Sequence, residues 1–551
     1  MAMRINDLIV KQWKVISENN VTNNPKPGST DPISAKWANN HMLQWHSSSN
    51  QIGTPGELGF GVGIFPSELP FGFSELPNTH DKTSENYGNY LYLDGSVMCW
   101  IPAFYYRIGN SLNKTHSTYG LNSIDIVPVS AFINRQSASQ QGFALHRAFI
   151  NKGLERPGFF VDKFQCSNNN GVASSIKHRD PLTVRSNNNP ITQLNNNPVG
   201  NNSGCVTAAK SRGELFHCMS RFQWSALALL SLAHAQYSTT ANINAWHDPT
   251  GSKNYPKGNN NSNLSDVDDV FVTWQSSDVY PELGKTGSGG NAATSTNNFA
   301  KTTHNGQTCG VSDLNGNLSE VTIGMTCLAV VKLISNITQA NPCVVTINNH
   351  GLYHNDIIMM SDAGGMSQLN NRLFKIFILD NNNIILDNVD STAMSPYSTG
   401  GVILSGKFYA AKESVDMSQL TNGTTTVNDH WSTVGVTTNF TEVSVNFNTQ
   451  YNSNISAQCF GNGSFQVFNP QSAGNAWLLT GLGLPASNGF STTGINLFGR
   501  DQYIQWIRNR MCVLSGGAWN GSHASGIWAT SLNGFNTETV NTVGFRTAAY
   551  I

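Results

Sequence analysis

Hydrophobic and polar positions alternate in two segments of the chain. The run CWIPAFYYRIG, which begins at Cys99, places enough apolar residues at every second position to predict a strand. The run PGFFVDKFQCSN, which begins at Pro157, predicts a second strand. The chain also holds 12 Trp, 15 Tyr and 27 Phe. These aromatic residues are enough to build a core around such strands, so the chain as a whole is not disordered.

A helical spacing of apolar residues runs from Ala208 to Gln236. It predicts one helix with a buried face, because apolar residues recur there every three to four positions. The predicted face consists of Phe222, Ala226, Leu229, Leu230 and Ala233, widened by Leu227 and Leu232.

Asn-rich segments lie between these elements, among them RSNNNPITQLNNNPVGNNSG and PKGNNNSNLSD. Asn tolerates left-handed backbone and caps its own turns, so we expect long surface loops there.

Residues 330–405 differ from these loops, because short apolar runs alternate with turn signals such as NNHG and DNNN. That pattern predicts a small inserted β module.

The first 98 residues form a distinct region that becomes rich in Gly and Pro, as in GTPGELGFGVGIFPSELPFGF. Two interpretations stay open for it: a segment for virion attachment and oligomerisation, or an extended arm packed on the main domain. The predicted organisation is therefore an N-terminal region (1–98), a main domain in two parts (99–329 and 406–551), and the inserted module (330–405).

Composition narrows the class of partner. Charged residues make up only 12% of the chain, the formal net charge is −1 and the pI is about 6.9. This balance argues against binding to nucleic acid or to an anionic membrane. Asn, Ser, Thr and Gly take the place of charges, as in many extracellular and virion proteins.

The apolar run from Ala226 to Ala233 is the longest in the chain and is far shorter than the ~20 residues of a membrane span, so we expect no membrane insertion. The start, MAMRINDLIVKQWKV, lacks the pattern of a signal peptide. We expect synthesis in a host cytoplasm.

The nine cysteines form no CxxC pair, and we expect mostly buried free thiols.

The inserted module resembles a small β module that recurs in phage tail proteins. The pattern of that module is HGL followed, at fixed spacing, by Asp, Ile, Ser, Gly-Met, Leu-Asn and Arg. The resemblance implies a spacer or accessory module that carries no catalytic chemistry. The matching residues are His350, Gly351, Leu352, Asp356, Ile358, Ser361, Gly365, Met366, Leu369, Asn370 and Arg372.

Three separated motifs resemble the C-type-lectin-like fold shared by formylglycine-generating enzymes and phage tropism determinants. They are FFVDKF from Phe159, GNLSE from Gly316, and VLSGGAW from Val513 with the closing VGFR from Val543. The resemblance implies an α+β fold over about 157–551, with two helices beside twisted antiparallel sheets. Three positions depart from the family pattern, namely Ser319, Val321 and Ser515.

The last segment, from Gly516 on, resembles the variable region of proteins diversified by retroelements. Such regions keep a skeleton of Gly, aromatic and apolar anchors. Here the skeleton is Gly516, Gly517, Trp519, Gly526, Trp528, Leu532, Val543, Gly544, Phe545 and Arg546. The residues between them would form the ligand-binding display set: Ala518, Asn520, Gly521, His523, Ser525, Ala529, Ser531, Asn533, Gly534, Asn536, Glu538, Val540 and Asn541.

A face that tolerates many side chains must be decoupled from the core. We expect Trp528, Leu532 and Phe545 to pack inward and hold the backbone. Residues between them can then face solvent and change at a cost within about 0.5 kcal/mol. A shared fold does not imply the activity of the formylglycine-generating enzymes. Formylglycine-generating enzymes use a cysteine pair near the C-terminus, whereas this chain has no cysteine after Cys512, so we expect no catalysis.

We expect no cofactor, with a structural calcium left open. The run Asp313-Leu-Asn315-Gly-Asn317 begins like a calcium loop, but an EF-hand is excluded because Leu318 stands where Gly is needed. A calcium ion bound by Asn317 or Glu320 stays an alternative to hydrogen bonds within a buried turn.

Together these observations predict a receptor-binding protein at a phage tail-fibre tip. It would bind a host-surface protein or glycan through the C-terminal face and other virion proteins through its N-terminal region. The resemblance also implies a homotrimer, in which linkage of weak sites can raise avidity by about 10²–10⁴. The alternatives are a structural head or tail decoration and, less favoured, an enzyme of the formylglycine-generating type.

Overall fold

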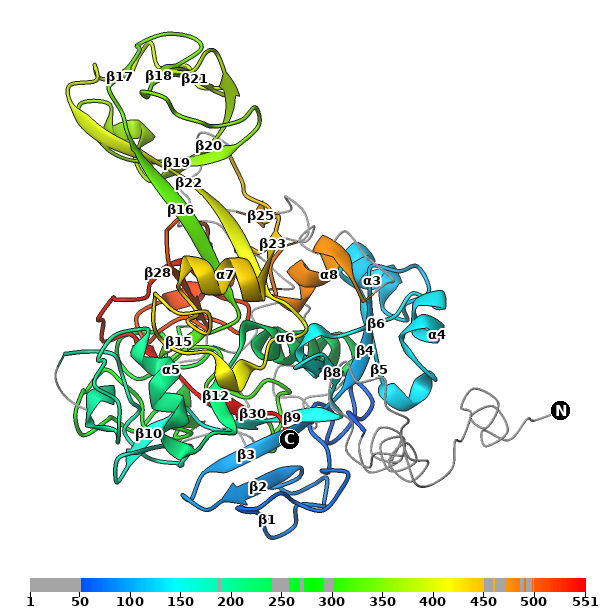
Figure 1. Cartoon of the computed structure of the whole chain (residues 1–551). Coiled ribbons are helices and arrows are strands. Elements are labelled where there is room, and N and C mark those ends of the chain that lie inside the picture. Colours follow the sequence, from blue (N-terminus) through cyan, green and yellow to red (C-terminus); the bar gives the residue numbers. More distant parts are fainter. Residues whose placement is uncertain are drawn as a thin grey trace, which may run out of the picture.

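A computed structural model describes most of the chain (Figure 1). The described residues are 51–186, 190–239, 257–267, 272–291, 302–449, 459–460, 472–485, 490–491, 498 and 500–551. The protein mixes helix (17%) and strand (29%), which gives an α+β fold at the coarse level. Two sheets and one long helix form the main body, and a lobe projects from it (Figure 1).

The first sheet has six strands and contains the end of the chain. Its order is β1-β2-β3-β9-β30-β12. The neighbouring strands β9 and β30 pair Val161 with Ala548, so the FFVDKF motif lies beside the C-terminal strand. The strands are β1 (Phe73–Glu75), β2 (Asn89–Tyr92), β3 (Val97–Pro102), β9 (Gly158–Asp162), β30 (Thr547–Ala549) and β12 (Phe216–Cys218).

The second sheet has five strands in the order β26-β28-β27-β15-β29 and carries the rest of the C-terminal segment. It joins the GNLSE motif to VLSGGAW, because β15 pairs antiparallel with β27. The closing VGFR begins on β29, which pairs parallel with β15. The strands are β26 (Tyr503–Ile504), β28 (Thr530–Phe535), β27 (Met511–Ser515), β15 (Ser319–Thr322) and β29 (Val543–Gly544).

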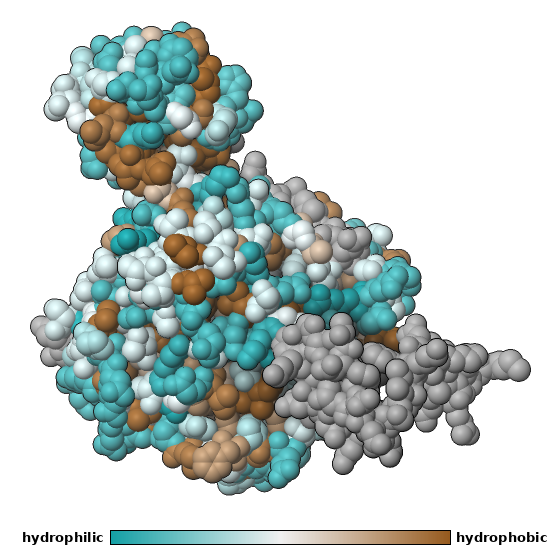
Figure 2. Space-filling view, in the orientation of Figure 1, coloured by the Kyte–Doolittle hydropathy of each residue, from teal (hydrophilic) through white to brown (hydrophobic). Residues whose placement is uncertain are grey.

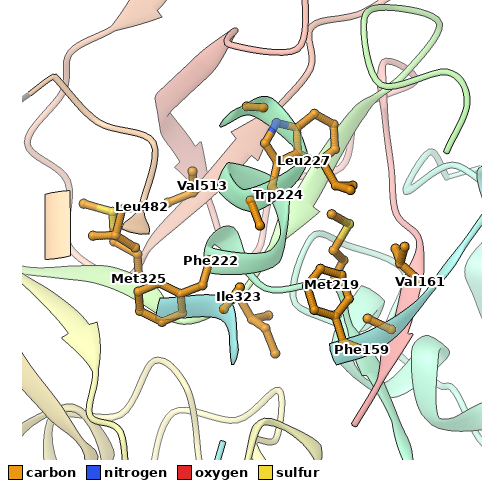
Figure 3. Packing of buried hydrophobic residues seen from close by; sticks show 14 of the residues in the cluster. Phe159, Val161, Met219, Phe222, Trp224, Leu227, Ile323, Met325, Leu482 and Val513 are labelled. Carbon is orange, nitrogen blue, oxygen red and sulfur yellow. The ribbon is translucent and has the colours of Figure 1, made fainter. Parts of the chain in front are cut away.

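Helix α6 (Arg221–Tyr237) packs against both sheets. Around its first two turns, Phe222 and Trp224 lie among buried side chains that include Phe159 of β9 and Val513 of β27 (Figure 3). Fifteen of its seventeen residues are buried. The predicted buried face of this helix is confirmed, and the helix is covered on nearly every side.

The predicted helix start at Ala208 is wrong. The segment instead forms a short helix α5 (Gly204–Ala209), then β12, and only then α6. Gly213 has φ +141°, a backbone conformation that interrupts the helix and is open to glycine. Ser220 then starts α6 with a capping box, since its hydroxyl accepts from the Gln223 backbone N–H and the Gln223 side chain accepts from the Ser220 N–H.

The predicted strand from Cys99 is divided. Strand β3 ends at Pro102, and β4 (Phe104–Ile108) belongs to a separate three-stranded sheet with β5 (Ile124–Pro128) and β6 (Ala144–Leu145). A proline cannot donate to the ladder, so the chain leaves the first sheet there and turns into the next.

Residues 51–98 do not form a unit of their own, so the predicted boundary at residue 98 is wrong. Ile52, Phe60 and Val62 are buried in the main core. Strand β2 pairs with β3 across the boundary, with Asn89 opposite Cys99. For this part of the N-terminal region, the interpretation as an arm packed on the main domain holds. Residues 1–50 lie outside the described part of the chain.

The lobe is carried on two long neighbouring strands of one eight-stranded sheet, β16 (Met325–Leu333) and β22 (Gly400–Ala411), which pair over nine positions (Figure 1). A separate cluster of buried apolar side chains fills the lobe, and all its members lie between Ile334 and Ile403. The lobe strands are β17 (Asn336–Ile337), β18 (Val344–Thr346), β19 (Ile357–Ala363), β20 (Arg372–Ile378) and β21 (Asn383–Leu386).

Short elements cover the remaining surface of the body. The helices are α3 (His116–Tyr119), α4 (Arg135–Gln140), α7 (Thr433–Asn439) and α8 (Gly474–Gly481). The strands are β7 (Ile150–Asn151), β8 (Leu154–Glu155), β10 (Ser167–Asn169), β11 (Val172–Ser174), β13 (Val272–Thr273), β14 (Gly290–Asn291), β23 (Phe440–Val443), β24 (Cys459–Phe460) and β25 (Phe490–Ser491).

Eight cysteines have described side chains, and all eight are free and buried, as predicted. Burial raises the pKa of Cys99 and Cys327 to about 12, which keeps these thiols protonated and unreactive at neutral pH. Among the residues that the structure describes, no helix is both long and apolar enough to cross a membrane.

Candidate ligand-binding face

A buried ion pair ties the closing VGFR motif to the GNLSE motif. Arg546 Nη2 lies 2.6 Å from Glu320 Oε1, and Arg546 Nε lies 2.7 Å from Glu320 Oε2. The same guanidinium donates to the backbone carbonyls of Asp162 and Ser312. Burial opposes its charge, but Glu320 and nearby carboxylates raise the pKa of Arg546. The three motifs that carry the sequence resemblance therefore meet at one buried arginine.

The two residues considered for calcium are engaged in this network. Asn317 Oδ1 accepts from the Gly284 N–H at 2.8 Å, and its Nδ2 donates to Gln165 Oε1 at 2.9 Å. Glu320 is occupied by Arg546 and by Gln165 Nε2 at 3.1 Å. Within the described ranges, no group of three or more His, Cys, Asp and Glu side chains is placed to hold a metal ion. The arrangement matches the hydrogen-bonded turn that was the alternative to a calcium site.

Ser515, one of the departures from the family pattern, is packed against an arginine from helix α6. Its hydroxyl accepts from Arg221 Nη1 at 2.8 Å, and Thr530 Oγ1 accepts from Nη2 at 2.7 Å. The carbonyls of Leu482 and Gly483 accept the other hydrogen bonds of this guanidinium. Burial lowers the pKa of Arg221 to about 9. The arginine thus fixes β27 and β28 side by side over the start of α6.

Strand β28 alternates between buried and outward-facing residues. Thr530, Leu532 and Gly534 are buried, whereas Ser531 and Asn533 are partly exposed. The predicted anchors Trp528, Leu532 and Phe545 are all buried, which confirms their inward packing. The strand therefore presents one set of side chains to solvent from a fixed backbone.

The predicted display set is corrected at five positions, which are buried. Side chains of a strand point to opposite faces in turn, so Asn533 and Gly534 cannot both face solvent. A Cβ on Gly534 would lie 2.3 Å from the Cys512 carbonyl oxygen. Ser525 Oγ donates to the Ala518 carbonyl at 2.9 Å inside the loop. The buried positions are Ala518, Ser525, Ala529, Gly534 and Asn536.

The other predicted display residues reach the surface. Asn520 is exposed, and the remaining seven are partly exposed. These seven are Gly521, His523, Ser531, Asn533, Glu538, Val540 and Asn541. These eight residues are therefore accessible from solvent, and their role in ligand binding stays a prediction.

A buried ion pair supports the loop between β27 and β28. Lys257 Nζ contacts Asp501 Oδ1, and both side chains are almost fully buried. Asp501 Oδ2 accepts from the Trp528 N–H at 2.8 Å, and a Cβ on Gly526 would lie 1.9 Å from Asp501 Oδ1. Burial raises the pKa of Asp501, while Lys257 favours the carboxylate. The pair pins the backbone at Trp528, between the display residues of the loop and those of β28.

Four residues from separate segments form a surface cluster at one end of the second sheet, called here the Tyr280 cluster. The Arg185 guanidinium lies 4.0 Å from the centre of the Tyr280 ring. The Trp519 ring lies 6.0 Å from the same ring at an interplanar angle of 66°. Asn541 Nδ2 donates to the Tyr280 hydroxyl. All four side chains are partly exposed.

A second cluster, called here the Arg508 cluster, lies on the outward face of β28. The Arg508 guanidinium lies 5.6 Å from the centre of the Trp506 ring and 5.8 Å from that of Phe535. Its Nη1 donates to the Asn533 carbonyl at 2.5 Å. Burial lowers the pKa of Arg508, and Glu538 acts in the opposite direction. The cluster brings a cation and two aromatic rings to the display positions.

Sequence reasoning missed most residues of these two clusters. A usable signal existed for Trp506 and Arg508, because they alternate with the buried Gln505 and Ile507. Arg185 and Tyr280 sit in loops and carry no local signal, since only the tertiary fold brings them beside Trp519. Trp519 was assigned to the skeleton but is partly exposed.

No protein-family model matches the chain, and no curated protein matches its sequence. The family resemblance therefore stays a prediction that rests on the sequence motifs.

Proposed function

We propose that this chain is a phage receptor-binding protein with a C-type-lectin-like domain, and that its C-terminal face binds a ligand on the host surface without catalysis. The observation that carries the proposal is the outward row of β28. Ser531 and Asn533 stand on a strand whose alternate residues are buried, beside the Arg508 cluster. Trp, Tyr and Arg are the side chains that most often dominate binding energy at interfaces.

The support beneath this face favours recognition over simple packing. The backbone is fixed from below by the Lys257–Asp501 and Glu320–Arg546 pairs, both buried. A rigid backbone with aromatic anchors and small polar positions is also how antibody paratopes are built. Changes at the outward positions should therefore alter binding while leaving the fold in place.

The remaining parts of the proposal follow from the resemblance. The protein would act at the tip of a tail fibre as a homotrimer, attached to other virion proteins through its N-terminal region. Three copies of a weak site on one particle would then act together, and the gain in avidity would offset a low affinity per site.

The test is binding of the purified full chain to candidate host cells. The test variant combines His523→Ala, Asn533→Ala and Glu538→Ala, which remove three partly exposed side chains of the face. The matched control is Tyr353→Ala, which removes a well-exposed side chain of the lobe. Binding by wild type and control, with loss in the triple variant at an unchanged melting temperature, supports the proposal. Equal binding by all three proteins contradicts it.

One observation favours the second candidate, a structural virion protein. Phe71 and Leu93 are strongly exposed, at 90% and 70%, and Gly72, the chain neighbour of Phe71, lies against Leu93, since a Cβ on it would sit 3.3 Å from Leu93 Cδ1. Figure 2 shows apolar surface at the end of the body where β1 and β2 lie. Such a patch suits contact with a neighbouring protein. It is compatible with the first candidate, since a receptor-binding protein must also attach to the virion.

A further inference from the structure

We propose that Lys257 and Asp501 become joined by an isopeptide bond, an amide between the side-chain amine of Lys257 and the side-chain carboxyl group of Asp501. The two groups are in contact, with Lys257 Nζ against Asp501 Oδ1. The bond is a permanent cross-link between two segments that lie 244 positions apart in the chain. It is independent of the proposed function, because it concerns the support beneath the face and not the ligand.

Burial distinguishes this pair from the other lysine–carboxylate pairs. The exposed fractions of the Lys257 and Asp501 side chains are 1% and 4%. In each of the four other such pairs among the described residues, one side chain is more than half exposed. Water stabilises the charged forms of an exposed pair, and an ammonium group has no lone pair with which to attack a carbonyl carbon. A buried pair has lost that solvation, so the neutral amine and the neutral acid become accessible.

The carboxyl group of Asp501 is prepared for attack. Burial raises the pKa of Asp501, which favours the protonated form whose hydroxyl can leave as water. Its Oδ2 accepts from the Trp528 N–H at 2.8 Å, and the Ala529 backbone also donates to this carboxyl group. The Trp528 N–H is therefore placed to stabilise the negative charge that develops on Oδ2 when the amine adds to Cγ.

Both reacting groups are held in place by the surrounding backbone. The Lys257 N–H donates to Asp266 Oδ2 at 3.1 Å, and the Asp501 N–H donates to the Phe498 carbonyl at 2.9 Å. Gly526 leaves the room that the carboxyl group occupies, since a Cβ there would lie 1.9 Å from Asp501 Oδ1. Such fixed proximity replaces an encounter in solution and lowers the barrier to a reaction that each molecule undergoes only once.

The reaction is a condensation that needs no oxidant, reductant or co-reactant. A proton first passes from the Lys257 ammonium to the Asp501 carboxylate, which gives a neutral amine and a neutral acid. The nitrogen lone pair then forms a bond to Asp501 Cγ, and the electron pair of the C=O bond moves onto Oδ2. A proton passes from the nitrogen to the Oδ1 hydroxyl, the bond from Cγ to Oδ1 breaks, and one water leaves. The C=O bond to Oδ2 re-forms, and one N–H stays in the amide.

The bond changes what the pair does for the fold. Oδ2 becomes the amide oxygen and still accepts from the Trp528 N–H, so the local backbone is kept. An ion pair separates when the protein unfolds, whereas an amide does not. The cross-link therefore restricts the unfolded chain as well, in the way that a disulfide across a long loop does.

The experiment measures the intact mass of the purified full chain under denaturing conditions, before and after incubation of the folded protein at neutral pH, and then maps its peptides. Lys257→Arg keeps a cation beside Asp501 but removes the reactive amine. Lys285→Arg is the matched control, because Lys285 pairs with Asp278 at the surface.

We expect wild type and Lys285→Arg to be lighter than their sequences by about 18 Da, the mass of one water, and Lys257→Arg to have its full mass. The wild-type peptides that contain Lys257 and Asp501 should appear as one branched peptide, which is decisive even if Lys257→Arg does not fold. Wild type at full mass after incubation, with the two residues in separate linear peptides, overturns the proposal. A mass loss that persists in Lys257→Arg places the lost water elsewhere in the chain and overturns it too.

Discussion

Lys257 and Asp501 form a buried ion pair beneath the loop that leads into β28, although 244 positions separate them in the chain. The pair connects the core to the surface, because Asp501 also accepts the Trp528 N–H. The local shape of the proposed binding face thus depends on a contact that no side chain of the face itself makes.

The first prediction follows from that pair. Lys257→Met should destabilise the protein by about 3–5 kcal/mol, because it leaves the Asp501 carboxylate buried without its cation. Chemical denaturation of wild type and variant gives the difference. Lys285→Met is the control, since Lys285 makes a surface pair with Asp278. A loss below about 1 kcal/mol for Lys257→Met, no larger than the usual worth of a surface pair, would show that the pair does not support the fold.

The second prediction concerns pH. Burial lowers the pKa of His146, His304 and His430 to about 3 and that of His217 to about 4. A histidine whose pKa is lower in the folded than in the unfolded protein contributes its full stability above the unfolded-state pKa of about 6.5. That stability is lost as the pH falls from there toward the folded-state pKa. Each of these four histidines should lower the free energy of unfolding by on the order of 2 kcal/mol when the pH falls from 7 to 5.

His430→Gln isolates one of these four contributions. Glutamine keeps an acceptor for the Gly324 N–H, which donates to His430 Nε2 at 2.8 Å, but it takes up no proton. The loss of unfolding free energy between pH 7 and pH 5 should be on the order of 2 kcal/mol smaller in this variant than in wild type. An identical loss in both proteins would mean that His430 does not contribute to acid sensitivity.

The third prediction separates the two faces of β28. Gly534→Ala should destabilise the protein strongly, because its Cβ would lie 2.3 Å from the backbone oxygen of Cys512. Ser531→Ala, on the outward face, should change stability by no more than about 0.5 kcal/mol. Thermal melts of the two variants decide this. Similar melting temperatures would argue that the alternation of the strand does not decouple the face from the core.

The fourth prediction concerns the lobe. The lobe has its own core, and its chain enters and leaves where Leu333 pairs with Val402. Replacing residues 334–401 by an Asn-Gly turn should therefore leave a folded body that still melts cooperatively. The control is a shorter deletion inside the body, of residues 412–432, which should not fold. An insoluble lobe deletion would show that the body depends on the lobe.

Strong periodicity carried most of what could be predicted from sequence. The buried face of α6 was predictable because Phe222, Leu229 and Ala233 repeat at helical spacing. Its start was not, because the break at Gly213 and the cap at Ser220 were read as part of the same pattern. The turn at Pro102 was missed for the same reason, since apolar residues continue on both sides of it.

The candidate site was predictable only in part. Motif spacing identified the C-terminal segment, and the anchors Trp528 and Phe545 are buried as expected. Five display positions were predicted wrongly because the motif fixes which residues are anchors but not which residues between them, in the loops and on β28, turn inward. Arg185 and Tyr280 could not be found, since tertiary packing alone brings two distant loops to Trp519.

The most direct test of the central claim compares two saturation libraries on β28, one at the outward Ser531 and Asn533 and one at the inward Thr530 and Leu532. Each library is sorted separately for folding and for binding to host cells. We predict that outward variants fold almost without exception but differ widely in binding, and that inward variants lose folding and binding together. Outward variants that all bind as wild type does would contradict the assignment of this face to receptor recognition.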